Sequence, residues 1–138
     1  MNDSGRELSD DDITQAEQQL GVTFPPPYRD FLKRHNGGHP EPDGFPVGDD
    51  DESTLQEFYG IDDSPSLLVE EVAQIRQIER IPRNYLPIAN DGMANSILLV
   101  TDGPETGKLY FWDHGAHPDD MFTELAPDLE GFLATFFD

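Results

Sequence analysis

The sequence predicts a single α+β domain in which helices flank a mostly antiparallel β-sheet. Apolar residues recur at helical spacing through the first part of the chain, whereas unbroken apolar runs of strand length occupy the last third. A length of 138 residues is usual for one domain, and the sequence contains no internal repeat and no interdomain linker. We therefore expect one domain over residues 1–138, with residues 1–8 frayed.

The first expected helix begins at Ser9. This residue can cap the helix, and Asp12, three residues later, completes a capping box. Gly21 is expected to end the helix, because glycine readily adopts the left-handed conformation of a C-cap. The apolar face between these points consists of Ile13, Ala16 and Leu20.

A second helix is expected after the prolines at positions 25–27, since proline is tolerated in a first turn. Its buried stripe follows the spacing i, i+3, i+4, i+7. The stripe consists of Tyr28, Phe31, Leu32 and His35.

Residues 39–53 are rich in proline, glycine and acidic residues, which predicts a loop with one short strand near residues 45–47. A further strand is predicted over residues 55–61.

The third helix is predicted to start at Ser64 and Pro65, with serine as the cap and proline at the first helical position. Pro82 is expected to close it. Its apolar face consists of Leu68, Val72, Ile75 and Ile78.

The last third of the chain is predicted to be mostly strand. Apolar segments at residues 86–89, 97–100 and 109–112 have strand length, and the last two do not alternate with polar residues. Such runs are typical of strands covered on both faces, so helices are expected on the sheet. Turn-forming residues at 102–107 predict a hairpin between the last two strands. Residues 128–137 predict a final helix.

Negative charge is the outstanding property of the composition. The chain has 29 Asp and Glu against 8 Lys and Arg, a formal net charge of -21. Such a surface repels phosphates, so binding to nucleic acid or to an anionic membrane is disfavoured. It attracts a basic protein and speeds the encounter. Solubility, or adaptation to a salty cytoplasm, is an alternative explanation of the same charge.

The sequence also predicts a cytoplasmic protein. The polar N-terminus contains no apolar run of the kind that a signal peptide needs, and the longest apolar runs are too short to cross a bilayer. Cysteine is absent, which excludes disulfides and thiol chemistry and agrees with a reducing compartment.

No motif points to catalysis, a metal or a cofactor. The chain lacks a G-x-S-x-G elbow and a phosphate-binding glycine loop. Gly37 and Gly38 interrupt the helix that would align His35 with His39, and the loop with His114 and His117 has acids nearby but no second ligand cluster. We expect a protein that is not an enzyme, although catalytic groups that meet only in space leave that possibility open.

Two segments carry a family pattern. The first runs Ile13-x-x-x-Glu17-x-x-Leu20-Gly21-Val22-x-Phe24-Pro25-x-x-Tyr28-x-x-Phe31-Leu32-x-x-x-Asn36-Gly37-Gly38. The second runs Leu86-Pro87-Ile88-Ala89-Asn90-Asp91-Gly92-x-x-Asn95-x-Ile97, followed by Gly107-x-x-Tyr110-x-Trp112-Asp113-His114. Together they resemble the SMI1/KNR4 family of the SUKH superfamily. Met93 and Ala94 depart from the pattern, since the family often has glycines after Asp-Gly.

The resemblance implies a fold and a role. The fold is α+β, with a mostly antiparallel sheet packed by helices. Bacterial members are similar to immunity proteins that neutralise polymorphic toxins, many of them nucleases, by direct binding, and fungal relatives act as regulatory interaction proteins. The family has no agreed catalytic residues, so the resemblance assigns none here.

The charge and the resemblance together lead to a hypothesis: an immunity protein whose acidic patch binds a basic partner, a polymorphic toxin domain. The first contact candidates are Asp49, Asp50, Asp51 and Glu52. The second are Asp91, Asn95, Asp113 and His114. The acidic run could instead be a solvated loop, and Asp91 and Asn95 could simply hold a turn. A regulatory scaffold without a toxin partner is the alternative function, and an enzyme is the third.

Overall fold

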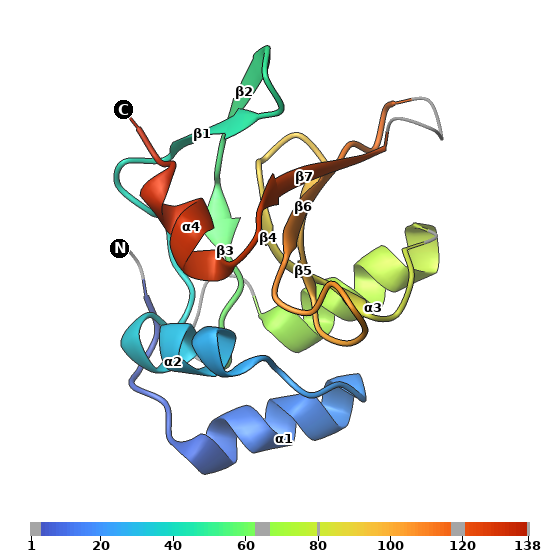
Figure 1. Ribbon diagram of the computed structural model, residues 1–138. Helices are drawn as coiled ribbons and strands as arrows, with labels where there is room; N and C mark the ends of the chain where they lie inside the picture. The colour runs from blue at the N-terminus through green and yellow to red at the C-terminus, as the bar shows by residue number, and fades with distance from the viewer. Residues whose placement is uncertain (1–3, 63–66, 80, 117–120, 138) are drawn as a thin grey trace.

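The computed structural model describes residues 4–62, 67–79, 81–116 and 121–137. Five strands form one antiparallel sheet in the order β3-β4-β5-β6-β7, and β1 pairs with β2 in a separate hairpin. Figure 1 shows α1 and α2 at one end of the molecule and the β1–β2 hairpin at the other. This architecture confirms the predicted α+β fold. The strands are β1 (Gly44–Val47), β2 (Asp51–Thr54), β3 (Glu57–Phe58), β4 (Tyr85–Asn90), β5 (Ser96–Val100), β6 (Leu109–Trp112) and β7 (Phe122–Ala126).

Helix α1 (Asp10–Leu20) has the predicted boundaries. The backbone N–H of Asp12 donates to Ser9 Oγ over 3.2 Å, and the N–H of Ser9 donates to Asp12 Oδ2 over 2.9 Å. Gly21 ends the helix at φ 71. The predicted capping box and glycine stop are therefore confirmed.

Helix α2 (Pro26–Arg34) buries Tyr28, Phe31 and Leu32, as predicted. His35 is the C-cap of the helix and is only partly buried, so the fully buried part of the predicted stripe ends at Leu32. Asn36 is buried and its side chain donates to Ile61 O over 2.7 Å and accepts from Ile61 N over 2.6 Å. This amide attaches the end of α2 to the loop after β3.

Residues 4–8 are not frayed. The N–H of Gly5 donates to Asn36 O over 2.8 Å, Ser4 Oγ donates to Gly37 O over 2.8 Å, and Leu8 is 5% exposed in the core. The prediction for this segment was wrong because a polar sequence gives no sign of backbone hydrogen bonds to a distant loop. Residues 1–3 lie outside the described residues.

The region predicted as a loop with one strand is a hairpin of two. In β1 and β2, Val47 pairs with Asp51, so the acidic run forms the turn and the second strand. Phe45 is fully buried in this hairpin, with its ring 5.4 Å from that of Phe132. The base of the hairpin is joined to the C-terminus, because Gly44 and Phe137 exchange two backbone hydrogen bonds of 2.9 Å. Strand β3 is shorter than the predicted 55–61.

Helix α3 (Leu68–Ile78) buries Leu68 and Val72, as predicted. The predicted start at Ser64 and Pro65 lies outside the described residues. Ile78 is 74% exposed, so its assignment to the apolar face was wrong. Spacing placed Ile78 on that face, but burial also requires a neighbouring element, and the described structure supplies none at the last residue of the helix.

The sheet has two covered faces at its centre. Every residue of β5 is buried, which confirms the prediction from its unbroken apolar run. Ile97 and Leu99 join the main core with α1, α2 and α4 (Leu129–Ala134). The alternate residues of the strands place an aromatic group on the opposite face. Its members are Tyr85, Tyr110, Trp112 and Phe122, whose rings contact one another.

The contact between the hairpin and the C-terminus predicts a cost for any side chain at Gly44. A Cβ there would lie 2.8 Å from Phe137 O and 3.0 Å from the ring of that residue. We expect Gly44→Ala to lower the free energy of unfolding by about 1–3 kcal/mol, measured by urea denaturation. Gly115→Ala is the control, because its Cβ would meet no atom closer than 3.9 Å. Equal stability of the two variants would contradict this packing.

Candidate functional site

A hollow of about 620 Å³ lies beside the β1–β2 hairpin and brings together residues from distant segments. The hairpin supplies one wall, and the β4–β5 turn, β6 with the loop after it, and β7 supply the others. Seven of the eight residues predicted from the sequence line it. They are Asp49, Asp50, Asp51, Glu52, Asp91, Asn95 and Asp113.

Asp91 and Asn95 form the support of the hollow. Asp91 is 9% exposed, and its Oδ1 accepts from the backbone N–H groups of Met93 (2.8 Å) and Asn95 (3.2 Å). Its Oδ2 accepts from Asn95 Nδ2 (2.9 Å) and Ser53 Oγ (3.3 Å). Four donors thus compensate a buried carboxylate for the loss of water. The interpretation that these two residues hold a turn is confirmed.

The same network joins three segments of the chain. Ser53 belongs to β2, so its bond to Asp91 attaches the hairpin to the β4–β5 turn. Asn95 Oδ1 accepts from the backbone N–H of His114 over 2.9 Å, which attaches the loop after β6. Asp91 and Asn95 therefore position the acidic walls of the hollow relative to one another.

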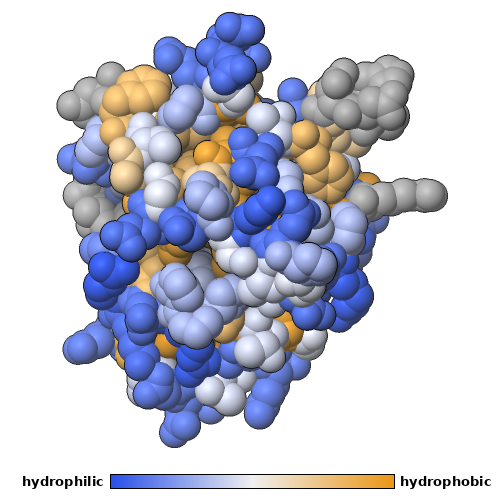
Figure 2. All heavy atoms as spheres, in the orientation of Figure 1, coloured by the Kyte–Doolittle hydropathy of each residue, from blue (hydrophilic) through white to orange (hydrophobic). Residues whose placement is uncertain are grey.

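The rim of the hollow is acidic and exposed. Asp49, Asp50, Asp51 and Glu52 are exposed, and Asp113 is partly buried, with Oδ1 accepting from Gly115 N over 3.1 Å. Among the described residues, no Lys or Arg lines the hollow and none forms an ion pair with these five carboxylates. Figure 2 shows the tip of the hairpin, at the top of the molecule, as strongly hydrophilic.

His114 does not line the hollow. Its Nδ1 contacts Glu79 Oε1, at the C-cap of α3, so its side chain is engaged outside the hollow. Of His114, only the backbone N–H belongs to the Asp91–Asn95 network, through its hydrogen bond to Asn95 Oδ1. The neighbouring His117, Asp119 and Asp120 lie outside the described residues.

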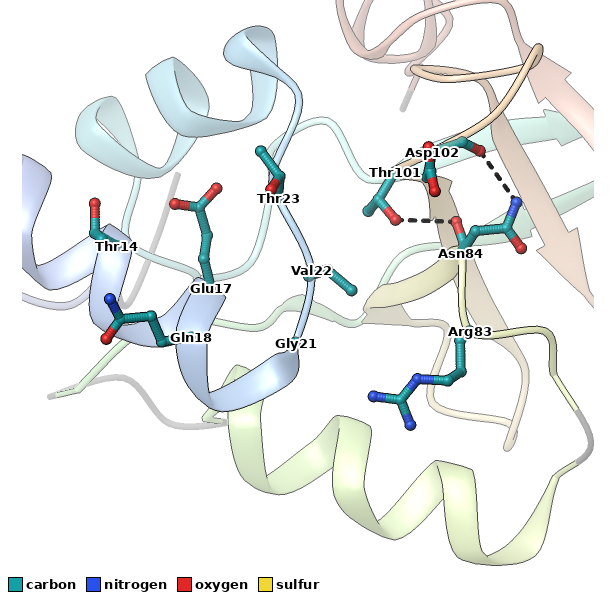
Figure 3. Close-up of a pocket in the computed structure, with 10 residues that line it drawn as sticks. All are labelled: Thr14, Glu17, Gln18, Gly21, Val22, Thr23, Arg83, Asn84, Thr101 and Asp102. Carbon is teal, nitrogen blue, oxygen red and sulfur yellow. Dashed lines mark hydrogen bonds between the residues drawn. The ribbon is translucent and has the colours of Figure 1, made fainter.

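A larger groove of about 880 Å³ lies at the other end of the molecule, and no sequence motif indicated it. Figure 3 shows Glu17 and Asp102 on its opposite walls. Glu17 accepts from Phe24 N over 2.6 Å and pairs with Arg29. Both carboxylate oxygens of Glu17 are therefore engaged in local structure.

Two arginines stabilise the end of α1, Arg83 from the lining of this groove and Arg76 from beside it. Arg83 Nη2 lies 3.3 Å from the position that a Cβ on Gly21 would occupy. Arg76 donates to Leu20 O and Arg83 O, and burial, followed by the charge of Arg83, lowers its pKa. Positive charge at a helix C-terminus complements the helix dipole. On the opposite wall of the groove, Asn84 Nδ2 donates to Asp102 O, and the backbone oxygen of Asn84 accepts from Thr101 Oγ1 (Figure 3).

Within the described ranges, no group of three or more His, Asp or Glu side chains is arranged to hold a metal ion. No helix in that part of the chain is both long and apolar enough to span a bilayer.

Comparison with known proteins gives two matches. A model of the SMI1 / KNR4 family (SUKH-1) matches residues 7–135. The chain is also similar to the "SPbeta prophage-derived uncharacterized protein YokK" of Bacillus subtilis (strain 168). The two are 29% identical over 158 aligned residues, which cover 99% of this chain and 80% of that protein.

The Asp91 network predicts a large effect of one substitution. Asp91→Ala leaves four donors without their acceptor, and we expect the free energy of unfolding to fall by about 2–4 kcal/mol in urea denaturation. Asp49→Ala, on the exposed rim, is the control and should change stability by less than about 0.5 kcal/mol. An Asp91→Ala protein as stable as the wild type would show that the network does not hold the turn.

Proposed function

The chain belongs to the SMI1/KNR4 family (SUKH-1), and from this membership and the acidic hollow we propose that it is an immunity protein that binds a basic protein toxin. The observation that carries the proposal is the set of five rim carboxylates without a cationic partner among the described residues. The rim consists of Asp49, Asp50, Asp51, Glu52 and Asp113.

Electrostatics explains why such a rim suits a basic partner. Like charges gathered in a concave surface concentrate the field there, which raises the rate of encounter with an oppositely charged protein. A nuclease toxin holds phosphates with Lys and Arg, so a polyanionic protein surface can occupy the same region. The rim would set the association rate and the choice of partner, and the toxin is proposed to be a nuclease on this ground.

The proposed role is binding without catalysis, in the cytoplasm, where such a toxin would act. The same negative field disfavours nucleic acid and anionic lipid as direct ligands. A regulatory scaffold differs from an immunity protein in a measurable way. Its partner need not be basic, and its binding need not weaken with salt.

The test compares two variants with the same change in charge. In the rim variant, Asp49, Asp50 and Asp51 become Asn and Glu52 becomes Gln. The partner is first captured from lysate of the source bacterium on the tagged wild-type chain at low salt. At low salt, we expect association of the rim variant with this captured basic protein to be slower by about tenfold or more, because the steering charges are gone. Association rates are measured by surface plasmon resonance at about 0.05 M and 0.5 M salt. At the higher salt concentration, the rates of the wild type and of the rim variant should become similar, because salt screens the charges.

The matched control neutralises four exposed acids outside the hollow, at Glu7, Asp11, Asp30 and Glu130. It should associate nearly as fast as the wild type. The captured protein must also be toxic when expressed alone, and co-expression of the wild-type chain, but not of the rim variant, should relieve that toxicity. A neutral partner, or binding indifferent to salt, would overturn the proposal in favour of a scaffold.

A further inference from the structure

Met93 is an apolar side chain presented to solvent at the acidic hollow. It is 77% exposed, at the tip of the β4–β5 turn, and it lines the hollow together with the rim carboxylates. Ile78, at the end of α3, is similarly exposed at 74% but lies outside the hollow. The two residues therefore form a natural pair for comparison.

The turn that carries Met93 is held in one conformation. Asp91 Oδ1 accepts from the N–H of Met93 itself, and Asn90 Oδ1 accepts from the N–H of Gly92 over 2.9 Å. Ala94 adopts φ 69, a left-handed conformation that is unfavourable for a residue with a Cβ. Strained backbone of this kind persists where the surrounding structure enforces it, and it concentrates at functional positions.

The surroundings of Met93 have the layout of a protein interface. Phe111, 6% exposed, and the partly buried Val47 also line the hollow, so apolar side chains and the acidic rim share one concave surface. Apolar anchors within a polar rim are typical of protein–protein contacts. A methionine side chain adapts to irregular pockets, and a turn already fixed before binding loses little further backbone entropy.

We infer that Met93 is the apolar anchor of the complex, inserted into a recess on a partner whose surrounding surface is basic. The basic character of the partner follows from charge complementarity with the rim, and this inference rests on the proposed function. The rim then controls how fast the partners associate, whereas Met93 controls how long the complex lasts.

The experiment measures dissociation from the basic protein that the tagged wild-type chain retains at low salt, purified on its own. Met93→Ala should dissociate about tenfold faster or more, with an unchanged association rate and unchanged salt dependence. Met93→Leu, which keeps the apolar volume, should stay within about threefold of the wild type. Ile78→Ala should dissociate at the wild-type rate. Thermal unfolding of each variant checks that it is folded.

A photo-cross-linking amino acid at position 93 or 78 provides an independent readout. We expect cross-links to the basic partner from position 93 and none from position 78. If Met93→Ala dissociates as slowly as the wild type while the rim variant still slows association, the anchor is disproved and the proposed function stands. If no basic protein is retained, the proposed function fails and the anchor fails with it.

Discussion

The buried carboxylate of Asp91 is the interaction on which the acid-rich end of the protein depends. A carboxylate that is 9% exposed needs donors to replace water, and it finds them in the β4–β5 turn and in β2. Through Asn95 the same group also holds the loop after β6. Exposed residues on three segments thereby gain a rigid support, which a site built on loops otherwise lacks.

The few cations of the chain decide where its negative charge remains uncompensated. Among the described residues, Arg6, Arg29, Lys33 and Lys108 form ion pairs with acids outside the hollow, and Arg76 and Arg83 lie at the end of α1. Those of the pairs that are exposed to solvent contribute little to stability. Their effect on the electrostatic field is larger, because they leave the rim of the hollow as an anionic surface without internal neutralisation.

The larger groove and the acidic hollow differ in what their polar groups do. Glu17 and Asn84, which line the larger groove, and Arg76 beside it hydrogen-bond to neighbouring groups and so hold local structure. In the smaller hollow, Asp91 and Asn95 hold local structure, whereas the four rim carboxylates of residues 49–52 are exposed. The hollow is thus the smaller of the two, but it is the one whose carboxylates of residues 49–52 are left exposed to solvent.

The sequence by itself determined the helix caps at Ser9 and Gly21, the central strands and the net charge, because these follow from local spacing and composition. It also identified seven residues of the hollow, as separate acidic and turn-forming segments. Only the tertiary structure decided that they meet, since β-pairing joins residues far apart in the chain. It likewise turned His114 towards Glu79, exposed Ile78 and tied down residues 4–8. The placement of these residues depends on which distant segments pack beside them, and a local sequence pattern carries no information about that.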